Sequence, residues 1–236
     1  MNAAVYFVAG TDTAVGKTRV TAGLLAAGRA AGLKVAGMKP VASGAEIHQD
    51  GLVSADALQI AAASGQTTPY KKLNPYCLLD AISPHIAANR QNIQLDIRKI
   101  DEIAVQLAGR HELLLIEGAG GWYTPISESE SMADLAKALG APVILVVGLR
   151  LGCLNHARLT REAIERVGCT LAGWIANRID PHLAASTENL ATLERLMDAP
   201  PLAVLPHAIN AAHDARHLQN ALARLRPART ARSRRG

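Results

Sequence analysis

The chain has 236 residues, of which 49% are hydrophobic, 19% are charged and only 3% are aromatic. A chain of this length is long for one domain and short for two, so we expect one large α/β domain whose core is mainly aliphatic. The net charge is +5, but residues 224–236 hold six arginines and no acidic residue, so the rest of the chain is close to neutral.

These properties argue against several classes of protein. No apolar run approaches the roughly 18–20 residues that a membrane span needs. The N-terminus lacks the basic segment of a signal peptide. We therefore expect a cytoplasmic protein without a membrane partner, and the near-neutral body argues against a nucleic-acid partner. We expect the domain to span residues 1–225 and residues 226–236 to form a basic, disordered tail.

The first predicted strand, residues 5–9, leads directly into Gly-Thr-Asp-Thr-Ala-Val-Gly-Lys-Thr at residues 10–18. A strand, a glycine-bounded turn and a helix that begins with Lys-Thr bind nucleotide phosphates, because backbone N–H groups and the positive end of the helix dipole attract anions. Lys17 can reach the β- and γ-phosphates, and the Thr18 hydroxyl can bind Mg²⁺. The turn is one residue longer than usual. The alternative is an ordinary strand–helix turn, but the order of elements favours a nucleoside triphosphate site.

The rest of the chain alternates between strands and helices. Apolar segments predict strands at residues 34–38, 112–116, 142–147, 170–176 and 201–205. Amphipathic patterns predict helices at residues 17–31, 54–64, 98–109, 131–139, 153–167, 186–197 and 214–224. This order predicts a single domain of the P-loop NTPase type: a mostly parallel, twisted sheet with helices on both faces and ligands at the carboxyl ends of the strands. Residues 65–97 break the alternation, and we interpret them as an extended excursion over the active-site face.

Lys39 follows the second predicted strand and precedes a proline, which favours an extended backbone at the ligand-binding end of the sheet. We expect this strand to lie beside the strand of the phosphate loop. A second ammonium group there can stabilise the charge of a transferring phosphoryl group. The alternative is a surface lysine in a loop.

Two carboxylates are candidate ligands of Mg²⁺. Glu117 ends an apolar strand and precedes Gly118, Ala119 and Gly120, whose backbone can approach a ligand closely. Asp56 lies early in the predicted helix at residues 54–64, where a carboxylate can also simply complement the helix dipole.

Later strand ends carry further candidates. Residues 151–156 open a helix whose free N–H groups can bind a substrate carboxylate, although Asn155 and His156 can equally be capping or surface residues. Asn177 ends a predicted strand and can present its amide to adenine, with a turn-forming asparagine as the alternative. Pro206 and His207 follow the last strand at the same edge of the sheet.

The combination of these motifs resembles the dethiobiotin synthetase family of the biotin pathway. The segments that carry the resemblance are residues 10–18, 39–44, 54–58, 74–76, 83–85, 117–122, 152–156 and 172–177. The resemblance extends from residue 4 to about residue 210 and leaves out the basic tail. It implies a homodimer that makes dethiobiotin from 7,8-diaminononanoate, CO₂ and ATP with Mg²⁺. A substrate amine takes up CO₂ as a carbamate, ATP phosphorylates the carbamate, and the second amine displaces phosphate to close the ring.

The resemblance also implies roles for single residues in ATP binding. Mg²⁺ is held by Thr18, Asp56 and Glu117. The catalytic cations are Lys17 and Lys39. Gly16 and Lys17 lie on the phosphates. The residues that also take part in binding the nucleotide are Thr13, Ala14, Val15, Thr18, Gly118, Ala119 and Gly120. The residues that flank adenine are Asn177, Pro206, His207 and Ala208. Ala14 stands where some relatives carry an acid, so its side chain is given no role.

For the diamine, the resemblance implies a site shared between two subunits. The reacting end contacts Thr13, Lys39, Ser43 and Gly120. The residues that bind its carboxylate, reaching across from the neighbouring subunit, are Gly152, Cys153, Leu154 and Asn155.

Two other classes share a similar phosphate loop. Amidases that build cobyric acid add a long glutamine-hydrolysing domain, for which this chain has no room. Partitioning ATPases of the ParA and MinD type, which act as switches on DNA or membranes, carry a lysine near the start of the phosphate loop. Here that stretch is Gly-Thr-Asp-Thr, and only the arginine tail could serve as their basic tether.

Overall fold

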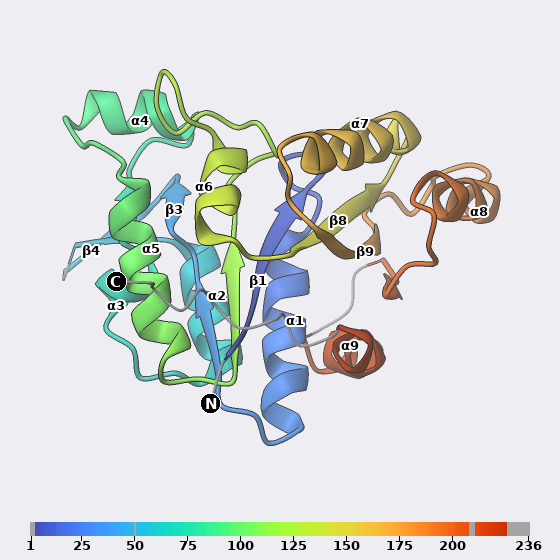
Figure 1. Cartoon of the computed structure of the whole chain (residues 1–236), viewed down its shortest axis with the longest axis horizontal. Helices are drawn as coiled ribbons and strands as arrows, with labels where there is room; N and C mark the ends of the chain where they lie inside the picture. Colours follow the sequence, from blue (N-terminus) through green and yellow to red (C-terminus); the bar gives the residue numbers. More distant parts are fainter. Residues whose placement is uncertain (1–2, 50, 208–210, 226–236) are drawn as a thin grey trace.

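The computed structural model describes residues 3–49, 51–207 and 211–225. Within these residues a six-stranded parallel sheet forms the centre of the molecule, in the strand order β10, β9, β8, β1, β7, β2 (Figure 1). The strands are β1 (Ala4–Gly10), β2 (Val35–Met38), β7 (Leu113–Glu117), β8 (Val143–Leu149), β9 (Leu171–Arg178) and β10 (Ala203–Leu205). The predicted fold class, a parallel P-loop-type sheet, is confirmed.

Helices cover both faces of this sheet, as Figure 1 shows. One face carries α1 (Lys17–Ala30), α2 (Ala55–Ser64) and α9 (Ala211–Arg224). The other carries α5 (Ile97–Ala108), α6 (Met132–Leu139), α7 (Cys153–Arg166) and α8 (Ser186–Leu196). Because both faces are buried, the strands are almost continuously apolar, which is why the sequence pattern identified them.

The side chains of β1 alternate between the two cores. Tyr6 and Val8 pack toward α1, whereas Phe7 and Ala9 pack toward α5 and α6, and all four are buried. On the first face, α9 lies very close to α1: a Cβ atom built on Gly23 would come within 2.5 Å of Leu218 Cδ1. This close approach brings the first turn of α9 beside the first turns of α1.

Every strand and helix predicted above is present, with ends that differ by three residues or fewer. The excursion is more ordered than expected, because residues 65–97 contain α3 (Tyr70–Leu73), β6 (Tyr76–Leu78) and α4 (Pro84–Arg90). β6 pairs in parallel with β3 (Val41–Ser43), directly after Lys39 and Pro40. A short hairpin of β4 (Glu46–His48) and β5 (Gly51–Val53) leads into α2.

One expectation about the sheet is wrong. The strand before Lys39 does not lie beside the strand of the phosphate loop, because β7 is inserted between β1 and β2. The three strands still end at the same edge: Val8 of β1 is opposite Glu117, and Met38 of β2 is opposite Ile116. Lys39 therefore approaches the phosphate loop across the end of β7.

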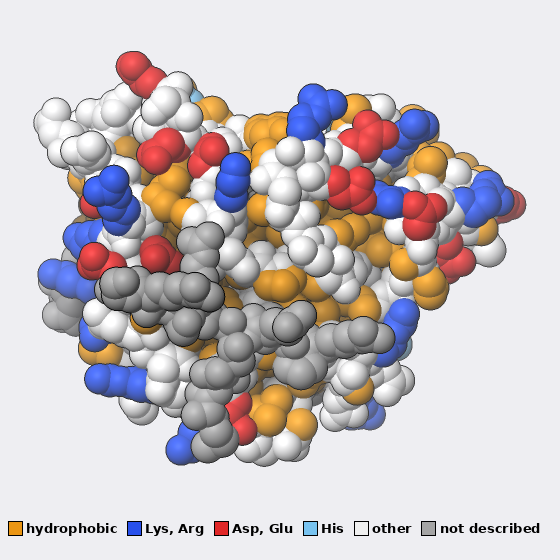
Figure 2. Space-filling view, in the orientation of Figure 1, with side chains coloured by type: hydrophobic (Ala, Val, Ile, Leu, Met, Phe, Trp, Pro, Cys, Tyr) orange, Lys and Arg blue, Asp and Glu red, His pale blue; other side chains and the backbone are white. Residues whose placement is uncertain are grey.

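In the part of the chain that the structure describes, no helix has the length and apolar character of a membrane span. On the face shown in Figure 2, acidic and basic side chains are interspersed. The predicted basic tail, residues 226–236, lies outside the described residues.

Candidate active site

The loop between β1 and α1 has the backbone of an anion site. Ala14 and Gly16 have φ angles of 57° and 91°, the left-handed conformation from which cradles of successive N–H groups are built. α1 begins at Lys17, and its N-cap, Gly16, has no side chain to cap the first turn, so the positive end of the helix stays available for an anion. The buried Lys17 ammonium donates to the Asp12 carbonyl at 2.8 Å. Thr13 lies exposed in this loop and Val15 is buried beneath it.

Beside this loop, a cluster of charged side chains forms around Lys39. Its ammonium lies 2.5 Å from Glu117 Oε1 and 3.0 Å from Asp56 Oδ2, and it donates to the Gly118 carbonyl at 3.2 Å. The Thr18 hydroxyl donates to the same Glu117 Oε1 at 2.8 Å. Lys39 is 4% exposed and Glu117 is fully buried. The structure thus brings together four of the side chains that the sequence singled out.

The excursion after α2 holds the backbone of Lys39. The Lys39 N–H donates to the Leu73 carbonyl at 2.8 Å, and the Lys39 carbonyl accepts from Asn74 Nδ2 at 2.7 Å. Asn74 is buried, and its Oδ1 accepts a hydrogen bond from the Tyr70 hydroxyl at 3.0 Å. These bonds fix the chain at the point where Lys39 leaves the sheet.

Asp56 is positioned by the start of α2. Ser54 is the N-cap of this helix, and its hydroxyl accepts from the Ala57 N–H. Asp56 consequently lies in the first turn and reaches the Lys39 ammonium, so the carboxylate has a partner besides the helix dipole.

The charges in this cluster determine which groups are ionised. Burial alone would lower the pKa of Lys39, but Glu117 and Asp56 together outweigh it and raise that pKa above its usual value. Burial would raise the pKa of Asp56, yet the charge and hydrogen bond of Lys39 hold it below its usual range. Lys17 differs: burial, and then the charge of Lys39, lower its pKa to about 8.

Three buried side-chain atoms of the described residues have no hydrogen-bond partner: Ser43 Oγ, Glu117 Oε2 and Trp122 Nε1. An unpaired carboxylate oxygen in a buried site is costly unless a cation or donor binds it. Mg²⁺ prefers oxygen ligands, typically one or two carboxylates together with phosphate oxygens. Glu117 Oε2, with Asp56 and Thr18 close by, therefore fits a magnesium site.

The loop after β7 lies against the phosphate loop. The Gly118 N–H donates to the Val8 carbonyl, and a Cβ atom built on Gly121 would lie 3.8 Å from Asp12 Cα, in ordinary van der Waals contact. Ala119 is buried against Met132. Gly120 has a φ of 63°, and a Cβ atom there would come within 2.3 Å of Thr124 Oγ1, so this turn requires glycine.

The start of α7 faces outward. Gly152 has a φ of 93°, and a Cβ atom built on it would meet no described atom within 4 Å. Cys153 is buried, Leu154 is half-buried and Asn155 is exposed. The preceding Leu151 is 92% exposed, so this end of α7 lies on the surface of the single chain.

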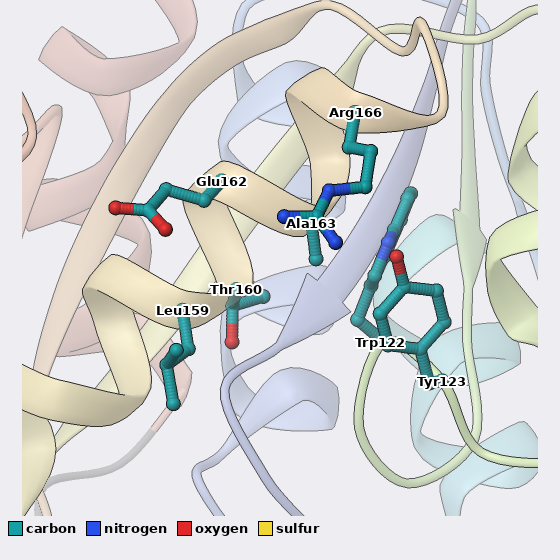
Figure 3. A pocket seen from close by; sticks show the side chains of 7 residues that line it. All are labelled: Trp122, Tyr123, Leu159, Thr160, Glu162, Ala163 and Arg166. Atoms are coloured by element: carbon teal, nitrogen blue, oxygen red, sulfur yellow. The ribbon is translucent and has the colours of Figure 1, made fainter.

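The outer side of α7 borders a pocket of about 370 Å³. In Figure 3 the rings of Trp122 and Tyr123 form one side of it, opposite the helix. The helix side is lined by Leu159, Thr160, Glu162, Ala163 and Arg166. Leu159 and Tyr123 are 56% and 54% exposed, so the pocket is flanked by exposed apolar surface.

The predicted adenine edge is partly occupied by contacts within the chain. The amide of Asn177 is buried and donates to the Val15 carbonyl at 2.9 Å, while its oxygen accepts from Arg19 at 3.0 Å. Pro206 also accepts from Arg19 through its carbonyl, and His207 is exposed. Ala208 lies outside the described residues.

No role was predicted from the sequence for several polar residues around this site: Arg19, Asn74, Arg150 and Asp214. Arg150 pairs with Asp12 of the phosphate loop. One signal was available for Arg19, because a cation in the first turn of a helix opposes the helix dipole and therefore needs an anionic partner. Nothing in the sequence pairs it with Asp214, which is 195 residues away.

The parallel sheet, the phosphate loop and the carboxylate at the end of the neighbouring strand define a P-loop NTPase. Solved structures with this fold include the septum site-determining protein MinD from Pyrococcus horikoshii OT3, complexed with Mg-ADP (TM-score 0.57, 19% identity, 94% of this chain and 95% of that one). A ParA family ATPase from Chlorobium tepidum TLS is also similar (TM-score 0.55, 13% identity, 93% of this chain and 91% of that one). At these identities the likeness shows the fold alone.

The family model described as an AAA domain matches residues 4–213. The ATP-dependent dethiobiotin synthetase of Chromohalobacter salexigens is 51% identical over 220 residues, covering 89% of this chain and 93% of its own. Those of Aromatoleum aromaticum and Nitrosospira multiformis are 48% and 47% identical, and they cover 87% and 92% of this chain and 92% and 93% of their own. The chain belongs to the dethiobiotin synthetase family, as its motifs predicted, and so is an ATP-dependent ligase of biotin biosynthesis.

Proposed function

We propose that the chain makes dethiobiotin by activating a carbamate of 7,8-diaminononanoate at the Lys39 cluster. One amine of the substrate adds to CO₂ and loses a proton, which gives the carbamate. A carbamate oxygen attacks the γ-phosphorus of ATP, and ADP leaves. The second amine then attacks the carbonyl carbon of the mixed anhydride, phosphate leaves and the five-membered ring closes. The observation that carries this proposal is the buried ammonium of Lys39 beside the phosphate loop.

In this reaction the protein mainly binds, orients and neutralises charge. The backbone cradle of the phosphate loop and the Lys17 ammonium bind the phosphates of ATP. Lys39 stabilises the negative charge that the carbamate and the transferring phosphoryl group share. Holding the carbamate and ATP in the reactive orientation lowers the activation free energy. Orientation of this kind can contribute up to roughly 7–11 kcal/mol.

Thr18, Asp56 and Glu117 are the residues that would hold Mg²⁺, which supplies neutralisation of phosphate charge when it is bound. In the structure the Lys39 ammonium already lies between the two carboxylates, at Asp56 Oδ2 and Glu117 Oε1. Glu117 Oε2 has no partner among the described residues, and it is the oxygen that remains for the cation.

The diamine site is completed by further residues in this proposal. Thr13, Ser43 and Gly120 contact the reacting end, and the unpaired hydroxyl of Ser43 supports a role as a hydrogen-bonding group there. Asn177, Pro206 and His207 border the base. The strand order supports the placement of the base, because the ends of β9 and β10 lie on the same edge of the sheet as the end of β1, which leads into the phosphate loop.

A homodimer would explain why the start of α7 is exposed in the single chain. Gly152 to Asn155 follow Leu151, which is 92% exposed, and a Cβ atom built on Gly152 would meet no described atom within 4 Å. A second copy docked on the apolar rim of the α7 pocket would cover this surface and bring these N–H groups to the neighbouring substrate carboxylate. We also propose that the reaction takes place in the cytoplasm. The three cysteines of the chain are all free thiols, as is usual in a reducing compartment.

The test is an ADP-release assay with Mg²⁺, run with and without diaminononanoate and bicarbonate. We expect ADP release to require both, together with formation of dethiobiotin. ADP release that is independent of the diamine would instead indicate a switch ATPase of the kind whose fold the chain shares.

A further inference from the structure

Arg19 connects four separate segments of the chain. It lies in the first turn of α1, where a cation opposes the helix dipole, and its side chain is 21% exposed. Its Nε and Nη2 atoms bind both carboxylate oxygens of Asp214 at 2.6 Å. Its Nη1 atom donates to Asn177 Oδ1 at 3.0 Å and to the Pro206 carbonyl at 2.9 Å. One guanidinium therefore joins α1, α9 and the ends of β9 and β10.

The amide of Asn177 is held in one orientation by these contacts. Its Oδ1 accepts from Arg19, and its Nδ2 donates to the Val15 carbonyl of the phosphate loop at 2.9 Å. A flipped amide would set NH₂ against the guanidinium donors and oxygen against the Val15 carbonyl, so both hydrogen bonds would be lost and replaced by repulsion. The orientation is thus locked from two sides.

Asp214 in turn holds Arg19. The carboxylate is 2% exposed and makes a bidentate pair with the guanidinium. It comes from the first turn of α9, which packs closely on α1 at Gly23. The C-terminal helix therefore contributes an anion to the edge at which the base of a nucleotide would bind.

We propose that Arg19, held by Asp214, is a positioning residue that determines the base preference of the nucleotide site by fixing the Asn177 amide. In the locked orientation Asn177 keeps one unused lone pair on Oδ1 and one unused N–H on Nδ2. The free lone pair can accept from the amino group of adenine, and the free N–H can donate to the adjacent N7. Guanine presents two acceptors, O6 and N7, at the same edge, so it cannot satisfy the Oδ1 lone pair. This inference depends on one part of the proposed function, namely that the nucleotide base binds beside Asn177.

The experiment compares the dissociation constants of Mg-ATP and Mg-GTP for the full chain and its variants, by equilibrium titration. Removing Arg19 alone would leave a buried, unpaired carboxylate, so the main variant is the double substitution Arg19→Met with Asp214→Leu, which replaces the ion pair by apolar side chains. We expect the ratio of GTP to ATP dissociation constants to fall about tenfold relative to the wild type. Asp214→Asn, which keeps the shape and removes the charge, should lower the same ratio by a smaller factor.

The matched control is Arg161→Met. Like Arg19, Arg161 is about one-fifth exposed (20%) and binds carboxylate oxygens and a backbone carbonyl, but its partners are Glu165, Asp198 and the Leu196 carbonyl, so it joins α7 to the end of α8. This variant should keep the wild-type ratio. An equal loss of ATP and GTP affinity in the Arg19 and Asp214 variants, or a wild type that binds both nucleotides alike, would overturn the inference. Dethiobiotin formation is measured separately, so a failure of the proposed reaction with intact base discrimination would leave this inference standing.

Discussion

Lys39 differs from an ordinary surface lysine in having two anionic partners and almost no contact with water. Its ammonium lies between Asp56 and Glu117, and it also donates to the Gly118 carbonyl at the start of the loop after β7. In such a site a fixed charge acts more strongly than it would in water, because the surroundings do not have to reorient during the reaction. The carboxylates keep the ammonium charged, since its pKa is raised.

We predict that Lys39→Ala abolishes dethiobiotin formation, with a loss in kcat of at least about 10²–10³-fold, because it removes the cation that stabilises the transferring group. The dissociation constant of ATP should change little, since the phosphate loop is intact. The control is Lys34→Ala, an exposed lysine just before the opposite end of β2. Turnover of the diamine by Lys39→Ala at the wild-type rate would refute the role.

Lys17 gives a prediction about pH. Its pKa is about 8 in the folded protein, so the ammonium is present below pH 8 and is lost as the pH rises through that value. Because the charged form binds the phosphates, the affinity for ATP should fall above pH 8 by up to about tenfold per pH unit. Equilibrium titrations of ATP between pH 6.5 and 9.5 would measure this. Lys17→Arg, whose guanidinium stays charged, should remove the fall; a fall of the same size in this variant would count against Lys17 as its origin.

At the scale of elements, the excursion between α2 and α5 supports Lys39. Asn74 donates to the Lys39 carbonyl and accepts from Tyr70, so it links the end of β2 to α3. The parallel pair of β3 and β6 continues this connection after Pro40. The excursion is therefore part of the frame of the site and not a passive cover over it.

Asn74→Ala should accordingly lower kcat by about tenfold and leave ATP binding nearly unchanged, because two buried polar groups lose a partner at a cost of about 1–3 kcal/mol. Steady-state kinetics and thermal unfolding would measure the two effects. The control is Asn189→Ala, which removes a side-chain bond to the Ala184 carbonyl at the start of α8. A variant with reduced Tm and wild-type kcat would show that Asn74 has only a structural role.

The periodicity of the sequence was enough to identify the sheet and its covering helices, since buried parallel strands are apolar throughout. It did not reveal β3, β4, β5 and β6, which are three residues each and too short for a pattern. The strand order could not be predicted either, because it depends on pairing between β2 and β7, which are far apart in the sequence.

At the site, Lys39, Asp56 and Glu117 could be identified from their places after strands and in a first turn. Arg19 and Asp214 required the structure, because their partnership is set by the docking of α9 on α1.

At the scale of the whole molecule, the fold alone does not distinguish the possible functions. MinD and ParA proteins share the sheet at 19% and 13% identity, whereas the dethiobiotin synthetases match at 47–51% over most of the chain. The sequence identity therefore distinguishes them where the fold does not.

We predict that Leu159→Glu converts a dimer to a monomer and lowers activity, because it places a charge on the apolar surface of α7. Sedimentation velocity and the KM for the diamine would measure this. Val105→Glu on α5 is the control, since Val105 is exposed to the same extent, 56%, on a helix that does not line the pocket. A wild-type chain that sediments as a monomer and is fully active would exclude the shared site.

Deleting residues 227–236 should leave activity unchanged. The last described residue, Leu225, directly follows α9 and is buried, and the deleted residues lie beyond every motif. Steady-state kinetics of the shortened chain would test this, and a several-fold loss of kcat would assign the arginine-rich segment a role in the reaction.

The insertion of β7 between β1 and β2 has an electrostatic consequence. The sheet presents its charges in the order cation, anion, cation, with Lys17 and Lys39 on either side of Glu117. The Glu117 carboxylate therefore lies within reach of both ammonium groups, and its charge raises the pKa of each, partly offsetting their mutual repulsion. A sheet that paired β1 directly with β2 would set two ammonium groups against each other with no intervening counter-charge. Without Glu117 between them, the pKa of each ammonium group would be lower than in the observed sheet.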